Sequence, residues 1–185
     1  MSSFLFVPTK MFLTRGVGIH REKLTSFEMA LRDAGIAAIN IIRVSSIFPP
    51  HCKIIPRSKG VKMLQPGAVV PCVVAESATN EPNRFIVASV GVAQPKDPNM
   101  YGYLSEHHAY GPDARTASDY AEDLAATMLA TTLGVDFNPD TSYDEKREIW
   151  KISGQIVRTS ALTQHAKGNK DGLWTTVIAA SVLLP

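Results

Sequence analysis

Two adjacent serines have neighbours that an ordinary turn does not require. Ser45 and Ser46 follow the β-branched run at residues 39–44 and precede a double proline at 49–50, within the string RVSSIFPP. A serine hydroxyl becomes a nucleophile when a base or a strained backbone activates it. Ser-Ser pairs are also common in turns, where the hydroxyls bond to nearby backbone groups. The pair alone therefore favours a structural role.

Two carboxylates are candidates for acid–base or binding roles. Glu106 lies in the string YLSEH, where a solvated loop carboxylate is the ordinary interpretation. Glu28 falls beside Leu24 and Leu31 on a helical wheel, and an acid on an apolar face is costly without a cationic partner. Alternatively, Thr25 and Glu28 are the N-cap and N3 residues of a capping box. Both interpretations of Glu28 stay open.

The metal-ligating residue types form no pattern that holds an ion. His107 and His108 are adjacent, so on a strand their side chains point to opposite faces, and no third ligand has a suitable spacing. The two cysteines, Cys52 and Cys72, make no CxxC pair and are expected to be small buried residues. We expect no metal site and no disulfide framework. This cysteine usage predicts a cytoplasmic location.

Length and composition limit the function classes. With 185 residues, 45% of them apolar and 19% charged, the chain is expected to form one globular domain with a large core. A net charge of +2 is too small to attract nucleic acid or an anionic membrane surface. Pro8 interrupts the apolar run at residues 4–7, so no signal peptide is expected. The apolar run at residues 173–184 is too short to span a bilayer, which needs about 20 residues.

Two helices are expected around the candidate residues. The first follows a polar lead-in that contains Gly16 and Gly18, and it ends near Gly35. The second begins after Thr116 in an Ala-rich stretch, and Gly134 stands where a C′ glycine would end it. The strands are expected at residues 39–44, 68–76, 84–94, 101–105, 149–159 and 173–184. This order predicts an α+β fold with helices covering the outer faces of packed sheets.

The wider string around the two serines carries a resemblance to a known family. Residues 40–50, NIIRVSSIFPP, closely resemble the self-cleavage segment of pyruvoyl-dependent arginine decarboxylases. The resemblance continues through residues 34–36, 67–71, 93–97 and 102–106, and it is strongest from about Leu24 to His107. It implies a proenzyme that cuts its own backbone between Ser45 and Ser46, giving chains of residues 1–45 and 46–185.

The residue types suit this chemistry. The Ser46 hydroxyl would attack the Ser45 carbonyl to form an ester, and β-elimination followed by hydrolysis would leave a pyruvoyl group at position 46. The resemblance implies that this covalent group is the cofactor. It condenses with the substrate amine as a Schiff base and withdraws electrons as the carboxylate leaves, so that L-arginine becomes agmatine and CO2.

The resemblance also assigns roles to other residues. Asn40 would assist cleavage and position the substrate, and Glu106 would return a proton to the α-carbon. Glu28 would hold the guanidinium, because a planar fork of donors pairs best with two acceptor oxygens, and Leu31 would line the same pocket together with Ser45. The implied fold is an αββα sandwich assembled as a trimer, or a dimer of trimers, with active sites between neighbouring protomers.

Two alternatives remain open at this stage. The family commonly has the shorter Asp where this chain has Glu28, so the same chemistry on another amino acid is one alternative. An uncleaved, non-catalytic paralogue that acts as a binding protein is the other. Agmatine can feed polyamine biosynthesis or consume protons in acid resistance, and the sequence does not choose between these pathways.

Overall fold

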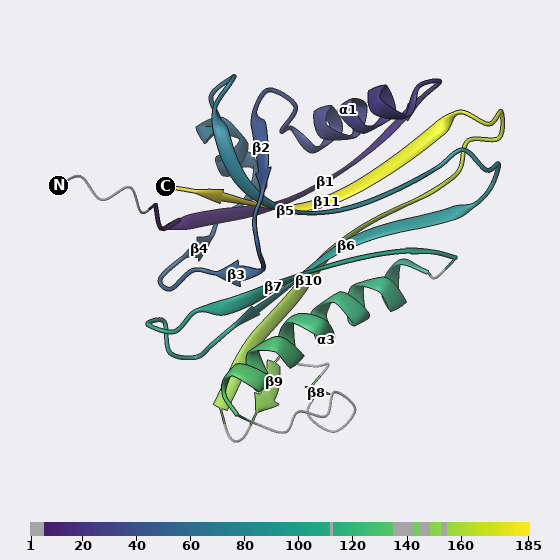
Figure 1. Cartoon of the computed structure of the whole chain (residues 1–185). Helices are drawn as coiled ribbons and strands as arrows, with labels where there is room; N and C mark the ends of the chain where they lie inside the picture. The colour runs from purple at the N-terminus through teal and green to yellow at the C-terminus, as the bar shows by residue number, and fades with distance from the viewer. Residues whose placement is uncertain (1–5, 112, 135–142, 145–148, 153–154) are drawn as a thin grey trace.

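The computed structural model describes residues 6–111, 113–134, 143–144, 149–152 and 155–185. Within these residues the chain has a mixed α+β architecture with two sheets and three α-helices (Figure 1). The mixed α+β class predicted from the sequence is therefore confirmed. The Pro, Asn, Asp and Gly content of residues 134–143 also predicts a loop, and most of it lies outside the described residues.

The first sheet has the strand order β2-β5-β11-β1-β4. Its long strands β1 and β11 are antiparallel over their whole length, and β11 also pairs with β5. The edge strand β2 is parallel to β5. The bounds are β1 Lys10–His20, β2 Asn40–Arg43, β4 Lys53–Ile54, β5 Val69–Thr79 and β11 Trp174–Leu184.

The second sheet has the order β3-β7-β6-β10-β9-β8. Its neighbouring strands are antiparallel throughout, and β3 is the edge strand that pairs with β7. The bounds are β3 Ile47–Phe48, β6 Phe85–Gln94, β7 Gly102–Tyr110, β8 Tyr143–Asp144, β9 Ile149–Ile152 and β10 Gln155–Lys167.

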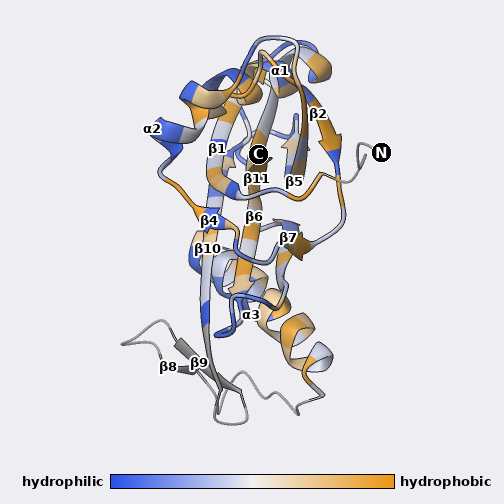
Figure 2. Ribbon diagram, turned by 90° about the vertical axis from the view of Figure 1, so that its left-hand side faces the viewer, coloured by the Kyte–Doolittle hydropathy of each residue, from blue (hydrophilic) through white to orange (hydrophobic). Residues whose placement is uncertain are grey.

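The two sheets face each other, and one long helix packs on each outer face (Figures 1 and 2). Helix α1 (Lys23–Ala34) packs on β1 and β11, whereas α3 (Ala114–Thr132) packs on β6, β7 and β10. Buried apolar side chains of β5, β6 and β11 meet between the sheets. The short α2 (Arg57–Gly60) and the 3-10 turn η1 (Val61–Met63) follow β4.

Helix α1 begins earlier and buries a different face than the sequence predicts. Its N-cap is Glu22, with no side-chain cap, so the capping box with Thr25 at the N-cap is wrong. Ser26, Ala30 and Ala34 form the buried face, while Leu24 is 80% exposed. The helix ends as predicted at Gly35, whose φ of 77° is the left-handed conformation that glycine adopts most readily.

Strand β1 was missed because its glycines indicate a loop. The glycines instead let α1 lie close against the strand: a Cβ on Gly16 would stand 2.2 Å from the Ala30 carbonyl oxygen, and one on Gly18 would stand 2.0 Å from that of Ser26. Strand-interior glycine often marks such a close approach of two backbones. Small residues on both elements therefore position α1.

The second predicted helix is confirmed as α3. Asp113 is its N-cap and accepts a hydrogen bond from the Thr116 N–H, and Gly134 follows with a φ of 67°. The predicted strand at 101–105 extends further, to Tyr110, as β7. The single strand expected at 149–159 is divided into β9 and the beginning of β10.

Candidate active site

The Ser45–Ser46 peptide bond lies in the segment that connects the two sheets. Strand β2 ends at Arg43 in the first sheet, and β3 begins at Ile47 in the second (Figure 1). On one side, the Val44 N–H donates to the Cys72 carbonyl of β5 at 3.1 Å; on the other, the Leu104 N–H of β7 donates to the Ser46 carbonyl at 2.7 Å. Residues 44–46, which we call the inter-sheet link, are thus attached at each end to a different sheet.

The Ser45 carbonyl has a donor within the chain itself. The N–H of Ile47 donates to it at 2.9 Å, which closes a three-residue turn around Ser46. Ser45 is exposed and Ser46 is half-buried. Water can therefore reach both serines.

The double proline leads into a well-anchored turn. Phe48 and Pro49 are buried, and the Cys52 N–H donates to the Pro49 carbonyl at 3.2 Å. His51 has a positive φ of 58°, which is uncommon for a residue other than glycine, and its N–H donates to the Pro98 carbonyl at 3.0 Å. The segment after β3 is thereby held against the loop that precedes β7.

Glu106 lies on β7 two residues beyond Leu104, the residue that bonds to Ser46. Leu104 is buried among side chains of the first sheet, whereas the Ser105 hydroxyl donates to a carbonyl of α3. Because side chains alternate along a strand, Glu106 shares the inter-sheet face with Leu104. It lines a cavity of about 550 Å³ between β5 and β7, together with Lys23, Arg43 and other polar residues.

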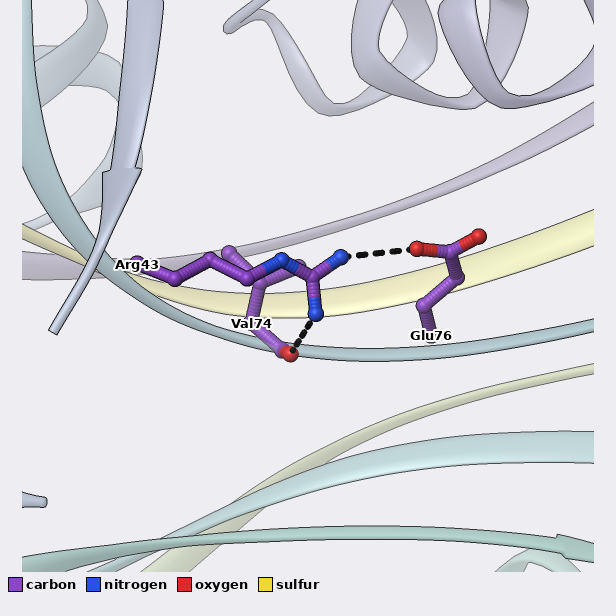
Figure 3. Close-up of polar contacts among 3 residues, drawn as sticks. All are labelled: Arg43, Val74 and Glu76. Carbon is purple, nitrogen blue, oxygen red and sulfur yellow. Dashed lines mark hydrogen bonds and ion pairs between the residues drawn. The ribbon is translucent and has the colours of Figure 1, made fainter. Parts of the chain in front are cut away.

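Arg43 extends from the end of β2 along β5 (Figure 3). Its guanidinium donates to the Val74 carbonyl at 3.2 Å and to the Glu76 carboxylate at 2.7 Å. All three residues line the same cavity as Glu106. This pair was not predicted from the sequence; its signals are an arginine inside the apolar run INIIRV and an acid at the end of AVVPCVVAE.

Asn40 lies at the other end of β2 from the inter-sheet link. Its side-chain amide donates to the Gly67 carbonyl at 3.0 Å, and its N–H donates to the Ala68 carbonyl at 2.8 Å. A strand rises about 3.3 Å per residue, so the Cα atoms of Asn40 and Arg43 are about 10 Å apart. Within one chain, Asn40 holds the loop that precedes β5.

Glu28 and Leu31 lie on α1, which is apart from β3 and the link in Figure 1. The Glu28 carboxylate accepts from Arg32 at 2.5 Å as an i,i+4 pair, and its side chain is 39% exposed. Glu28 therefore lies outside the buried face of the helix. Leu31 is half-buried against the core of the first sheet. One chain brings Ser45, Ser46 and Glu106 to neighbouring segments, and leaves Asn40, Glu28 and Leu31 apart from them.

The thiols are poorly suited to act as nucleophiles. Burial raises the pKa of Cys52 to about 11 and that of Cys72 to about 12, so both are protonated at neutral pH. Both are free and buried. Among the residues that the structure describes, no three His, Cys, Asp or Glu side chains gather as a metal site would require. In the same part of the chain, no helix is long and apolar enough to cross a membrane.

Comparison with known protein families shows to which family this sequence belongs. Residues 10–185 match the model of pyruvoyl-dependent arginine decarboxylase. The chain belongs to this family. The family name carries both an enzyme class, a decarboxylase, and a prosthetic group, the pyruvoyl group. The resemblance inferred from NIIRVSSIFPP is thereby confirmed, and it extends through the second helix to the C-terminus.

Individual members of the pyruvoyl-dependent arginine decarboxylase family are similar over nearly their full length. A probable pyruvoyl-dependent arginine decarboxylase of Chloroherpeton thalassium is 58% identical over 97% of this chain and 99% of its own. The pyruvoyl-dependent arginine decarboxylase of Nitrosopumilus maritimus is 56% identical over 96% and 97%. That of Methanococcoides burtonii is 52% identical over 96% and 99%. The non-catalytic alternative is not favoured by these names.

Proposed function

We propose that this protein is a pyruvoyl-dependent arginine decarboxylase, which converts L-arginine to agmatine and CO2. One observation carries the proposal: the Ser45–Ser46 bond of the family's cleavage segment lies in the inter-sheet link, between Val44 and Ser46 backbone groups that are bonded to different sheets. Relatives that share more than half of its residues carry this name.

Maturation begins with the chain's own serines. The Ser46 hydroxyl oxygen bonds to the Ser45 carbonyl carbon, the C–N bond breaks, and the amine of Ser46 takes up a proton, leaving an ester. Loss of the Ser46 α-proton then breaks the Cβ–O bond and releases Ser45 as a carboxylate. The dehydroalanine that remains takes up water and releases ammonia. The products are residues 1–45 and residues 46–185, the latter beginning with the pyruvoyl group.

The fold can keep both products together. Residues 1–45 include β1, which lies between β11 and β4 in the first sheet and pairs with β11 from Lys10 to His20. They also include α1, whose Ala30 and Ala34 are buried against that sheet. A cut in the link therefore leaves the sheets paired. We assign the architecture to the αββα sandwich of pyruvoyl-dependent decarboxylases.

The pyruvoyl group supplies an electron-withdrawing carbonyl that stabilises the negative charge left when CO2 departs. Serine at position 46 fits this group, since its hydroxyl is the leaving oxygen of the elimination and its half-buried place adjoins β7. Glu106 returns the proton to the substrate α-carbon. Its place on the inter-sheet face of β7, in a polar cavity, supports this role.

Residues from a neighbouring protomer would complete the site. Asn40, Glu28 and Leu31 lie apart from the link in one chain, so their roles in substrate binding need a second copy. Ile42 on the edge strand β2 and Val69 at the beginning of the neighbouring β5 are 50% and 62% exposed, and such apolar surfaces favour burial against a partner. We propose a homo-oligomer, a trimer or a dimer of trimers, in which Glu28 holds the guanidinium.

The cellular setting follows the same proposal. Two free, buried thiols suit a cytoplasmic protein. Agmatine contains two basic nitrogen groups. We propose that it serves as a precursor in polyamine biosynthesis.

An amino-acid panel tests the activity and the substrate together. Purified protein is incubated separately with arginine, lysine, ornithine, histidine and aspartate, and CO2 and amine product are measured. Ser46→Ala protein, which lacks the nucleophile for cleavage, is the matched control. We expect release of CO2 and agmatine from arginine in the wild type alone. A clear preference for another amino acid would contradict the substrate, and equal turnover by Ser46→Ala would contradict the pyruvoyl chemistry.

A further inference from the structure

The N–H of Ile47 points away from the strand that its own residue pairs with. Ile47 lies opposite Tyr103, and Phe48 lies opposite Gly102. The next pair of residues along the two strands is Ser46 and Leu104, and in it the Leu104 N–H donates to the Ser46 carbonyl. Hydrogen-bonded and non-hydrogen-bonded pairs alternate in antiparallel strands, so Ile47 and Tyr103 form a non-hydrogen-bonded pair. The Ile47 N–H therefore faces outward from the sheet.

This outward direction brings the donor to the scissile carbonyl. Strand β3 is at the edge of its sheet, where an outward N–H has no further strand to bond. The Ile47 N–H instead donates to the Ser45 carbonyl oxygen at 2.9 Å. That oxygen is the atom on which negative charge develops when the Ser46 hydroxyl attacks the Ser45 carbon.

We infer that the backbone N–H of Ile47 is the oxyanion donor of self-cleavage. The inference rests on the proposed cleavage at Ser45–Ser46 and adds a group to its mechanism. During attack, the new Oγ–C bond forms as the carbonyl π electrons move onto oxygen, where the Ile47 N–H already donates. As the tetrahedral centre collapses, those electrons return, the C–N bond breaks and the nitrogen of Ser46 takes the hydroxyl proton.

The inter-sheet link holds the donor and the carbonyl in this arrangement before reaction. The Val44 N–H is bonded to β5 and the Ser46 carbonyl to β7, so the groups on both sides of the scissile bond are fixed. A donor that is already in place requires no reorganisation when charge develops, which is the basis of oxyanion stabilisation in enzymes.

The structure distinguishes this donor from the side chain that the family resemblance nominates. The Asn40 amide donates to the Gly67 carbonyl, at the far end of β2 from the link. It does not donate to Ser45 in this chain. Within one chain, the group that donates to the Ser45 carbonyl is therefore a main-chain N–H, and the residue type at position 47 matters little for it.

An amide-to-ester substitution removes this donor and keeps the side chain. The α-hydroxy analogue of isoleucine is incorporated at position 47 of the full chain by nonsense suppression, which replaces the N–H by an oxygen. The matched control carries the α-hydroxy analogue of leucine at position 104, which removes the donor to the Ser46 carbonyl. Both variants and the wild type are made by cell-free synthesis, and the loss of intact chain is followed by mass spectrometry, which also distinguishes cuts at 45/46 from ester hydrolysis at 46/47.

We expect the ester at position 47 to slow cleavage at Ser45–Ser46 by about 10²–10³-fold, the usual loss for one oxyanion donor. The ester at position 104 should slow it by less than about 10-fold, as loss of an ordinary hydrogen bond does. Equal slowing by the two esters would show that anchoring of the link sets the rate and would overturn the inference. Cleavage of the Ile47 ester at the wild-type rate would overturn it as well.

Two controls separate the inference from the function on which it rests. If the wild type stays intact, the proposed self-cleavage fails; if it cleaves and the Ile47 ester cleaves equally fast, only the oxyanion role fails. In a Ser46→Ala background, both esters should lower the unfolding midpoint alike, by about 2–4 °C. Loss of the fold in the Ile47 ester alone would assign this hydrogen bond a structural role and overturn the inference.

Discussion

Leu104 donates its backbone N–H to the carbonyl oxygen of Ser46 at 2.7 Å, and this bond attaches the cleavage segment to the second sheet. Two residues earlier, Val44 is bonded to Cys72 of the first sheet. Cleavage between Ser45 and Ser46 would therefore break the covalent connection between the two sheets at this point, while each new end stays hydrogen-bonded to its own sheet.

Glu106→Gln should lower decarboxylation without stopping cleavage. The amide cannot return a proton, so we expect kcat to fall by about 10²–10⁴-fold with a smaller change in KM. Turnover is measured as agmatine release, and cleavage as fragment masses. Glu81→Gln is the matched control, because this exposed carboxylate lies outside the cavity. Unchanged kcat in Glu106→Gln would contradict the assigned proton transfer.

Arg43 and Glu76 should stabilise the end of β2 by a measurable coupling. Their contact is 2.7 Å long and partly shielded, so a double-mutant cycle with Arg43→Met and Glu76→Gln should give about 0.2–1 kcal/mol. Urea unfolding of Ser46→Ala protein, which remains one chain, measures each free energy of unfolding.

The pair Arg84 and Glu81 provides the comparison for this cycle. It is 3.9 Å long and more exposed, so its coupling should be near zero. A larger coupling for Arg84–Glu81 than for Arg43–Glu76 would contradict the prediction that the ion pair in the cavity stabilises the fold more than the exposed pair does.

The sequence predicted the local features of this fold better than its long-range contacts. The helix that ends at Gly35 and the cleavage string at residues 40–50 were identified because their signals lie within a few neighbouring residues. Strand β1 was missed because Gly16 and Gly18 favour loops locally, and only their contact with α1 explains them. The apolar face drawn through Leu24, Glu28 and Leu31 was wrong for the same reason, since the face that α1 buries is set by the close approach of β1.

The residues of the candidate site likewise divide into those that the sequence identified and those that only the structure reveals. Ser45, Ser46 and Glu106 were identified through a family string, and the structure places them on the link and on the strand bonded to it. The ion pair of Arg43 and Glu76 joins two strands that are far apart in sequence. The turn donor at Ile47 is a main-chain group, and no pattern of side chains can reveal it.

Gly16→Ala should destabilise the fold. Its Cβ would stand 2.2 Å from the Ala30 carbonyl oxygen and 2.7 Å from the Ala34 nitrogen, so α1 must move away from β1. Such overpacking costs about 1–3 kcal/mol or more. Urea unfolding in the Ser46→Ala background measures the loss, and Leu24→Ala, on the exposed face of α1, should change it by less than about 0.5 kcal/mol. Equal stability of Gly16→Ala and its parent would contradict the close packing.

His107 should make stability fall at acidic pH. Burial and the neighbouring His108 lower the pKa of His107 below its ordinary value of 6.5, and its ring packs against Tyr120. As the pH falls through 6.5, the unfolded chain takes up this proton first, so the free energy of unfolding decreases until the folded pKa is passed. His107→Gln should reduce the loss between pH 7.5 and pH 5.5 in urea unfolding. An identical loss in both proteins would exclude this contribution.

The most direct test of the central proposal is the intact mass of the purified protein under denaturing conditions. We predict two fragments that divide after Ser45, with a ketone-bearing, blocked N-terminus on residues 46–185, and a single uncut chain for Ser46→Ala. A single wild-type species of 20.1 kDa that persists on long incubation would contradict self-cleavage and the pyruvoyl mechanism with it.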